Sequence, residues 1–378
     1  RSQVKDGDLL VKITGVGRMA IASVAPKDFV GNTNQHMVVI RTGDRVVSEY
    51  LASYLNLDIV EKLATRRATG ATRPALDYPA LKSIPIVENV DFSILENAQI
   101  EKSKKDAEAN ILIASIDKYL LDKLEIQIPN FKNKLQNRIF FSSANEITGN
   151  RFDPKLYSAE TKAIKNAILN GSYGTVHLSD YIIQSYAGDW GKEDSGIPIE
   201  NHTKCLVIRA TEFDNIFNLK LDNTRVKYRY INSEKLKKID LQSGDLLIEK
   251  SGGSIDQPVG RISILRDDII SDNTLCYSNF IHKIRVDSNE FNPEYLFAYL
   301  KTIHSIGLTE AMQSQTNGIR NLIMRTYFKQ QIPKPSITIQ NEIADEIMSI
   351  RLRAKNKLAE AESILETAKQ EIEKQLLA

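Results

Sequence analysis

The feature that most constrains the fold of this chain is an internal repeat. The string Gly7-Asp8-Leu9-Leu10 returns as Gly244-Asp245-Leu246-Leu247. In each copy the string opens a predicted strand, which is followed by a glycine-containing loop and a second strand. Because copies of one sequence pattern fold alike, the repeat predicts two similar modules within one chain.

The repeat continues in the same order through three further segments. Glu49-Tyr50-Leu51 returns as Glu294-Tyr295-Leu296, and the apolar spacing around both strings predicts an amphipathic helix. A polar turn with glycine and arginine follows in each copy, and a strand with an Ile-Pro pair closes it. The turns are 69–73 and 316–321, and the closing strands are 84–86 and 332–335. Ordered matches of this kind are hard to obtain by chance, so we predict two mixed α/β (α+β) modules.

Each copy ends in a predicted long helix, over residues 94–126 and 339–378. Apolar residues three and four apart form one stripe on each helix, although the first helix is polar over residues 101–106. Such a stripe must be buried, and we predict that the two helices pack on each other as an antiparallel coiled coil. A coiled coil between chains is the alternative. The predicted packing residues are Leu112, Ile116, Leu120, Leu124, Ile343, Ile347, Ile350, Leu358, Leu365 and Ile372.

Composition places the chain among soluble globular proteins. Of its 378 residues, 42% are apolar and 26% are charged, which argues against disorder. No apolar run approaches the ~18 residues of a membrane span, and two cysteines are too few for a disulfide framework. We therefore expect a cytoplasmic protein. The net charge of +2 does not by itself favour nucleic acid, but basic residues gather over 62–73 and 301–334.

Taken in order, these motifs resemble the specificity subunit of type I restriction-modification systems. The Gly-Asp-Leu-Leu strings and the Glu-Tyr-Leu helices carry part of the resemblance. The rest lies in Ser251-Gly252-Gly253-Ser254, Asn317-Gly318-Ile319-Arg320-Asn321, and Ile332-Pro333-Lys334-Pro335 followed by Gln340. Segments 151–154, 178–181 and 188–191 also resemble the opening of such a module. The resemblance covers nearly the whole chain and depends on the order of the motifs.

The resemblance implies a DNA-recognition subunit that carries no chemistry of its own. Each module would read one half of a bipartite DNA site. The helix pair would set the spacing between the halves and dock methyltransferase subunits. S-adenosylmethionine and ATP are expected only on partner subunits, which include a DNA adenine methyltransferase and a motor-nuclease restriction subunit. We expect no cofactor, no metal and no catalytic residue in this chain.

The resemblance also predicts the domain boundaries. About 107 residues lie between the central helix and the second Gly-Asp-Leu-Leu string, whereas six precede the first string. We therefore expect the first target-recognition domain to lack its N-terminal half. The predicted domains are 1–92 (rear part of the first target-recognition domain), 93–127 (central spacer helix), 128–338 (second target-recognition domain) and 339–378 (C-terminal spacer helix).

Candidate DNA contacts lie in the glycine-containing loops. Lys250–Ser254 combines a cation with two glycines, so its amides can face a phosphate. In the loop 315–321, Arg320 suits guanine, and Asn317 or Asn321 suits adenine. A plain turn is the alternative for both loops. The candidates are Lys12, Arg18, Arg66, Arg67, Thr69, Gly70, Thr72 and Arg73 in the first module, and Lys192, Lys250, Ser251, Gly252, Gly253, Ser254, Arg261, Asn317, Gly318, Arg320 and Asn321 in the second.

Other motifs point to no further chemistry. Gly15-Val16-Gly17-Arg18-Met19-Ala20 fits a nucleotide-binding glycine string, but a predicted strand rather than a helix follows it. The five histidines lack metal-ligand spacing, and Trp190 is interpreted as core packing in preference to base stacking. Two alternatives stand beside the DNA-recognition subunit. One is the C-terminal target-recognition region of a single-chain fused restriction-methyltransferase, and the other is a coiled-coil scaffold without DNA contact.

Overall fold

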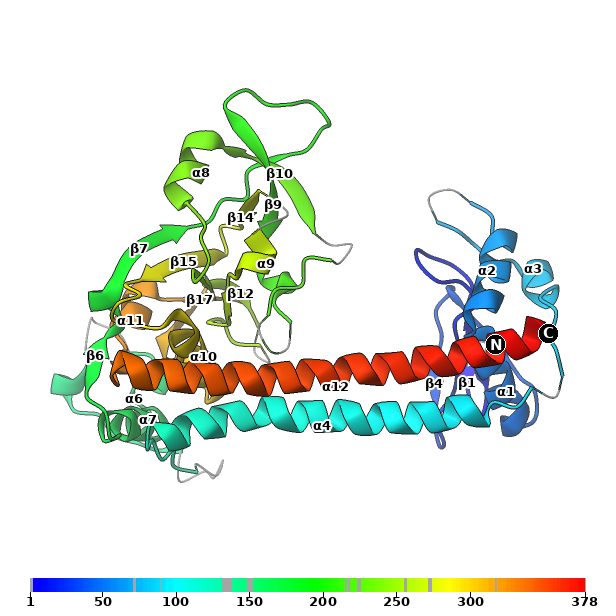
Figure 1. Ribbon diagram of the computed structural model, residues 1–378, viewed down its shortest axis with the longest axis horizontal. Coiled ribbons are helices and arrows are strands. Elements are labelled where there is room, and N and C mark those ends of the chain that lie inside the picture. The colour runs from blue at the N-terminus through cyan, green and yellow to red at the C-terminus, as the bar shows by residue number, and fades with distance from the viewer. Residues whose placement is uncertain are drawn as a thin grey trace. The chain divides into compact units, whose positions relative to one another are not determined.

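The computed structural model of the chain combines helices and strands in two compact units (Figure 1). Unit 1 comprises residues 1–110 and 354–378, and unit 2 comprises residues 111–353. The mixed α/β fold class is therefore confirmed. The structure describes residues 3–70, 73–88, 90–130, 138–147, 152–214, 216, 218–222, 226–254, 257–270, 274–316 and 318–377.

Unit 1 is built on a three-stranded antiparallel sheet with the strand order β3-β2-β5. Helix α1 packs on β2 and β3, and Leu9 and Val11 of β2 are fully buried in the core of this unit. A second, two-stranded pair joins β1 to β4. The elements are β1 (Gln3–Val4), β2 (Leu9–Lys12), β3 (Ala22–Val24), β4 (Gly31–Asn32), β5 (Met37–Ile40), α1 (Arg45–Leu55), α2 (Asp58–Arg67) and α3 (Tyr78–Lys82).

Unit 2 has short helices interspersed with four sheets among its described residues. The sheets have the orders β14-β9-β10-β8, β13-β11-β15-β7, β12-β17-β16 and β18-β6. The helices are η1 (Ala144–Glu146), α6 (Pro154–Tyr157), α7 (Ala159–Leu169), η2 (Leu178–Tyr181), η3 (Ala210–Glu212), α8 (Ser233–Ile239), α9 (Asp267–Ile270), α10 (Pro293–Ser305), η4 (Leu308–Met312) and α11 (Met324–Phe328).

The strands of unit 2 are mostly antiparallel, and β14 with β9 is a parallel pair. They are β6 (Thr175–His177), β7 (Ile182–Ala187), β8 (Lys192–Glu193), β9 (His202–Ile208), β10 (Lys227–Asn232), β11 (Leu246–Glu249), β12 (Ser251–Gly253), β13 (Ile262–Ile264), β14 (Leu275–Tyr277), β15 (Ile281–Val286), β16 (Gln313–Thr316), β17 (Ile319–Leu322) and β18 (Gln331–Pro333). The short lengths leave many strand ends, and the loops that follow them supply the polar surface.

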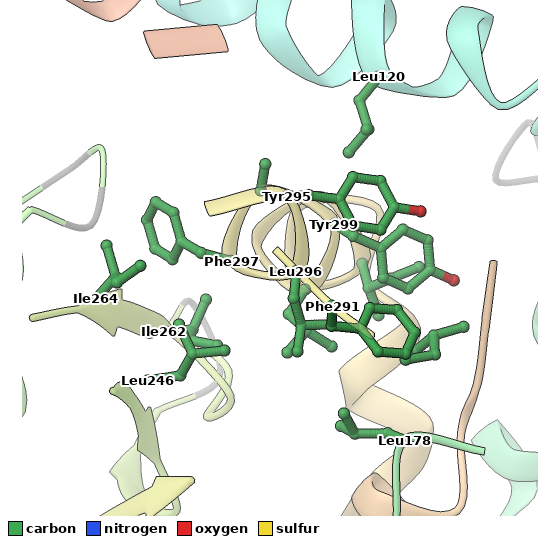
Figure 2. Close-up of a cluster of buried hydrophobic side chains, with 14 of the residues drawn as sticks. Leu120, Leu178, Leu246, Ile262, Ile264, Phe291, Tyr295, Leu296, Phe297 and Tyr299 are labelled. Atoms are coloured by element: carbon green, nitrogen blue, oxygen red, sulfur yellow. The ribbon is translucent and has the colours of Figure 1, made fainter. Parts of the chain in front are cut away.

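Helix α10 lies in the largest buried cluster of unit 2. Every side chain from Tyr295 to Ile303 is buried. Figure 2 shows the helix with Leu120 of the first long helix on one side and Leu246 and Ile262 of the sheet on another. The sequence predicted an amphipathic helix with one apolar face. The helix is confirmed, but it is buried all round because the long helix covers the side that would otherwise face solvent.

The Gly-Asp-Leu-Leu string has the same backbone geometry in both units. Gly7 and Gly244 both have a left-handed φ, at +78° and +87°, which favours glycine. The carboxylates of Asp8 and Asp245 each accept a hydrogen bond of 2.9 Å from the backbone N–H three residues earlier. The string therefore forms the tight turn that leads into β2 and β11, respectively.

Each of these aspartates also pairs with an arginine from the neighbouring strand. In unit 1, Arg41 lies 3.7 Å from Asp8. In unit 2, Arg285 lies 2.7 Å from Asp245, and Lys283 lies 3.2 Å from the same carboxylate. Asp245 and Lys283 are completely buried, and burial lowers the pKa of Lys283. Because a buried charge is stable only when it is paired, this string is a folding motif in both units.

The closing Ile-Pro segments are held by matched tyrosines. In unit 1, the hydroxyl of Tyr54 in α1 donates to the carbonyl of Pro85 at 3.1 Å. In unit 2, the hydroxyl of Tyr299 in α10 donates to the carbonyl of Gln331 at 3.3 Å. The two tyrosines are the residues that the repeat aligns, so the sequence repeat is a structural repeat.

The two long helices, α4 (Ser93–Lys123) and α12 (Ile337–Leu377), each contribute one part to each unit. They run antiparallel side by side, as predicted (Figure 1). In unit 2 the contact between the two helices is apolar, because large apolar residues spaced three or four apart lie on one face of each helix. The buried seam there contains Ile116, Leu120, Leu124, Ile343, Ile347 and Ile350, with Leu112 partly buried beside it.

In unit 1 the same two helices are joined by charged pairs. The polar stretch 101–106 of α4, which interrupts the predicted stripe, supplies two lysines that reach glutamates of α12: Lys102 is 2.8 Å from Glu362, and Lys105 is 2.7 Å from Glu360. Just beyond the stretch the charges are reversed, and Glu108 of α4 lies 2.5 Å from Lys357 of α12. Residue numbers rise along α4 as they fall along α12, which is the antiparallel arrangement.

The predicted seam is partly wrong in the part of α12 that belongs to unit 1. Leu358 is 39% exposed and Leu365 is half-buried. The buried positions there are spaced seven apart and are small: Ala354, Ala361 and Ala368. Small side chains allow closer approach of the helices, and the larger leucines are displaced to the flank. Ile372 is fully buried as predicted, within the core of unit 1.

Candidate nucleic-acid interface

The two polar glycine loops of the second module form adjacent strands of one small sheet. Strand β12 pairs with β17, and β17 pairs with β16, all antiparallel. Ser251 is opposite Asn321, and Gly253 is opposite Arg320. The sheet thus joins Lys250–Ser254 to the hairpin 313–322, a meeting that the sequence did not predict.

The base of this hairpin is anchored by main-chain hydrogen bonds. The N–H of Leu322 donates to the carbonyl of Lys250 at 2.8 Å. In unit 1, the N–H of Leu76 donates to the carbonyl of Ile13 at 2.8 Å. Both units therefore hold their arginine-containing loop against the strand that follows the Gly-Asp-Leu-Leu string.

The glycines of the loop are required by close backbone contacts. Gly252 has a φ of +102°, and a bulge separates Ser251 from Gly253. A Cβ atom at Gly253 would lie 2.7 Å from Cγ1 of Val259 and 2.8 Å from the carbonyl oxygen of Gln257. Any other residue at Gly253 would collide with backbone and side-chain atoms. These glycines shape the sheet whether or not the loop also binds phosphate.

Arg320 and Gln315 are two long polar side chains of this hairpin that remain available. They are opposite each other in the β16–β17 register, and cross-strand partners project on the same face of a sheet. Gln315 is exposed and Arg320 is half-buried. Neither side chain forms a hydrogen bond or ion pair within the part of the chain that the structure describes. Sequence reasoning included Gln315 in the loop but did not select it, because its pairing with Arg320 depends on strand register.

Asn321 has a different environment. Its Oδ1 accepts a hydrogen bond from the hydroxyl of Ser251, so both predicted contacts are engaged inside the sheet. Gly318, at the tip, is exposed with a φ of +79°. Ser254 forms the turn after β12, since its N–H donates to Gln257 at 2.9 Å. Asn317 lies outside the described residues.

Arg261 is not available to DNA, which corrects its selection as a contact. It is 9% exposed. Its Nε and Nη2 donate to the two carboxylate oxygens of Glu249 at 2.8 and 2.9 Å. A two-bond pair of this kind uses the whole fork of the guanidinium. Arg261 therefore stabilises the β11–β13 hairpin.

Three predicted contacts of the first module also have partners within the protein. Lys12 donates to the carbonyl of Val16 at 2.9 Å. Arg18 lies 2.6 Å from Asp58. Arg67 donates to the hydroxyl of Ser83 at 3.0 Å and to a carbonyl of its own helix. The exposed candidates of this module are Arg66, Thr69, Gly70 and Arg73, and Thr72 lies outside the described residues.

The loop around Thr69 is a shorter version of the hairpin in unit 2. Thr69 and Ala75 exchange two main-chain hydrogen bonds, of 2.9 and 2.8 Å. Gly70 has a φ of +98°, and a Cβ atom there would lie 2.9 Å from the carbonyl oxygen of Arg73. By the match of Leu76 with Leu322, Pro74 occupies the position of Arg320, and Arg73 lies one residue before it.

Trp190 packs within unit 2, as interpreted from the sequence. Its half-buried ring borders the core beneath β9 and β14. The guanidinium of Arg229 lies 4.4 Å from the ring centroid, and its Nε donates to the Trp190 carbonyl. A cation already stacks on the ring, so the ring is not a free platform for a base. The neighbouring candidate Lys192 is exposed on the edge strand β8.

The described residues contain neither a group that could hold a metal ion nor a helix that could span a membrane. No group of three or more His, Cys, Asp or Glu side chains among them is placed to hold a metal ion. No helix in the described part of the chain combines the length and apolar character needed to cross a membrane.

Comparison with known families identifies the second module. Residues 191–366 match the family model of the type I restriction modification DNA specificity domain. This stretch contains the whole β12-β17-β16 sheet. The chain therefore carries a type I restriction-modification DNA specificity domain, and its resemblance to the specificity subunit is confirmed. No curated protein sequence matches the chain.

Three solved structures resemble the chain at low sequence identity. The S subunit of the type I restriction-modification system from M. genitalium is 14% identical with a TM-score of 0.43, over 98% of this chain and 84% of that one. The HsdS subunit from Thermoanaerobacter tengcongensis is 13% identical with a TM-score of 0.35, over 99% and 81%. A chain from a study of complex assembly and conformational transition of the type I R-M system is 13% identical with a TM-score of 0.43, over 98% and 82%.

Proposed function

We propose that the chain is the DNA-recognition subunit of a type I restriction-modification complex, in which each unit reads one half of a bipartite site. The family supports DNA specificity for the second module. The observation that carries the proposal is the side-by-side pair Gln315 and Arg320 at the tip of an anchored hairpin. Their chemistry suits base edges, because Arg pairs bidentately with guanine and Gln with adenine.

The rest of the small sheet suits the DNA backbone. Lys250 supplies a cation at the base of the hairpin, and Gly252 at the bulge is exposed. Phosphate contacts of this type position a protein on DNA without selecting sequence. Gly318 lets the hairpin tip approach closely. We assign base reading to the hairpin tip and phosphate contact to the loop 250–254.

In unit 1, we assign base reading to Arg73. Arg66 and Arg73 are exposed, and Thr69 and Gly70 form the loop between them. These residues lie at the place that the structural repeat matches to the hairpin of unit 2. The first half-site is thus assigned to a smaller loop with two cations. Lys12, Arg18 and Arg67 are left out because their side chains bind within the protein.

The helix pair is proposed to set the distance between the half-sites and to dock methyltransferase subunits. In this scheme the chain performs no catalysis. S-adenosylmethionine and ATP bind the methyltransferase and motor-nuclease partners. The charged pairs that join α4 and α12 in unit 1 support direct packing of the two helices on each other there.

The test is DNA binding by the full chain to duplexes from a methylation-defined site, followed over a range of salt concentrations. Arg320→Ala is expected to cost about 1–3 kcal/mol and to relax one base position. Lys250→Ala is expected to weaken binding to all sequences equally and to reduce the salt slope by about one. An Arg320→Ala protein that kept both affinity and base preference would contradict the assignment. Absence of duplex binding at low salt would favour the scaffold alternative.

A further inference from the structure

Unit 2 contains a partly enclosed cavity that the proposed DNA surface does not use. It has a volume of about 620 Å³ and lies between α7, η4, α11 and the start of β18. Its floor is apolar, with Ile168, Leu308 and Met312 each almost fully buried. Leu169 lies at its edge and is 52% exposed. A cavity of this size and lining is typical of sites that take up apolar side chains of a ligand.

The rim of the cavity carries positive charge. Lys165, Arg325 and Lys329 line it, and no acidic side chain does. Arg325 and Lys329 are exposed, and their side chains form no ion pair with the part of the chain that the structure describes. Apolar floor and cationic rim together are complementary to a segment that is apolar on one face and acidic at its edges.

The cations of the rim are not needed to build the fold. The repeat provides the comparison, since α3 follows the loop of unit 1 as α11 follows the hairpin of unit 2. Leu76 of unit 1 and Leu322 of unit 2 are matched residues that lie 246 positions apart. With the same offset, Arg325 matches Pro79 and Lys329 matches Ser83. The same local fold forms without either charge, so Arg325 and Lys329 are not required for it.

The wall of the cavity also holds an unsatisfied acceptor. Gln330 is 7% exposed and lines the cavity. Its Nε2 donates to the carbonyl of Tyr327 at 2.9 Å, but its Oε1 has no hydrogen-bond partner among the described residues. Buried polar atoms nearly always have a partner. A donor that entered the cavity would provide one.

We propose that this cavity docks an acidic amphipathic helix of the methyltransferase subunit, an inference that rests on the proposed function. Apolar residues three or four apart on such a helix would fill the floor, and flanking carboxylates would pair with Arg325 and Lys329. The free N–H groups of its first turn are the donors that suit Gln330. DNA fits the site less well, because a phosphate backbone would leave the apolar floor exposed to water.

The test measures binding of the full chain both to the methyltransferase subunit of the same restriction-modification system and to duplex DNA. Charge reversal in Arg325→Glu/Lys329→Glu is expected to weaken methyltransferase binding at least tenfold and to leave DNA binding within twofold. Leu169→Glu, at an exposed position where folding is not at risk, should weaken the same interaction. Lys237→Glu/Lys238→Glu on the exposed face of α8 is the matched control, and it should leave methyltransferase binding unchanged.

The other outcomes overturn the proposal in distinguishable ways. If the rim variant loses DNA affinity and keeps the methyltransferase, the rim is a phosphate contact. If it loses neither, the cavity has no role in assembly. If the wild-type chain binds DNA but not the methyltransferase, the docking proposal is contradicted and the DNA-recognition proposal is not. A chain that binds neither contradicts the proposed function itself.

Discussion

Unit 1 and unit 2 share a main-chain framework and differ in how much charge they bury inside it. In both, a glycine with left-handed φ precedes an aspartate that pairs with an arginine. In unit 2 that aspartate is completely buried and has a buried lysine as a second partner. In unit 1 the matching arginine is half exposed and 3.7 Å away. The repeated sequence string thus forms the same turn in both units. How much its ion pair contributes to the free energy of unfolding depends on how deeply the pair is buried.

The largest expected effect tests this difference directly. Asp245→Ala leaves Lys283 buried without its carboxylate, so we expect a loss of about 3–5 kcal/mol in the free energy of unfolding. Asp8→Ala removes a partly exposed pair and should cost about 1 kcal/mol or less. The only tryptophan, Trp190, is in unit 2, so its fluorescence in urea follows that unit, and circular dichroism during urea unfolding follows the Asp8 variant. Equal losses in the two variants would show that the units bury charge alike.

A second comparison concerns the two parts of the helix pair. The seam in unit 1 consists of alanines, so Ala361→Leu should overpack it and cost about 1–3 kcal/mol. Leu358→Ala, at the neighbouring exposed position, should change the free energy of unfolding by less than about 0.5 kcal/mol. Circular dichroism during urea unfolding measures both. If Leu358→Ala cost more stability than Ala361→Leu, Leu358 would be the packing residue, as the sequence predicted.

The smallest expected effect is a pH dependence that belongs to unit 2 alone. Burial lowers the pKa of His282 from 6.5 to about 4. The unfolded chain therefore binds a proton between these values that the folded chain does not, so stability falls as pH falls from 6.5 toward 4. Because the ring is partly exposed, we expect on the order of 1–2 kcal/mol.

The measurement is the urea midpoint from Trp190 fluorescence at pH 7 and pH 5. His282→Gln should flatten the difference, since it removes the titrating ring. The matched position in β5 of unit 1 is a valine, Val38, so Val38→Ala serves as a control that leaves the pH dependence in place. A pH dependence of the same size in His282→Gln would assign it to other groups.

Much of the scaffold was predictable from the sequence because helical spacing is a local pattern and a repeat can be recognised at any distance along the chain. The long helices follow from residues close together, whereas the two α/β modules and the antiparallel packing follow from comparing the two copies. Burial of Arg261 was not predictable, since its partner Glu249 is twelve residues away and any surface acid would look the same. The pairing of Gln315 with Arg320 likewise depends on register.

The error in the helix seam has a related cause. Hydrophobicity alone favours Leu358 over Ala361 as a packing residue. Which of them faces the partner helix depends on how closely the two backbones approach, and this distance is set by all the contacts together. The polar stretch of α4 was interpreted as a break in the packing stripe for the same reason. Its lysines do contact α12, but their carboxylate partners lie more than 250 residues later in the sequence.

The base of the unit 2 hairpin is held by main-chain hydrogen bonds, which do not depend on the identity of the side chains. Residues at its tip can therefore be exchanged without disturbing the scaffold that carries them. On the proposed function, a new target sequence requires only a few point substitutions between residues 315 and 320. In that case, chains with the same architecture could be specific for different DNA sequences.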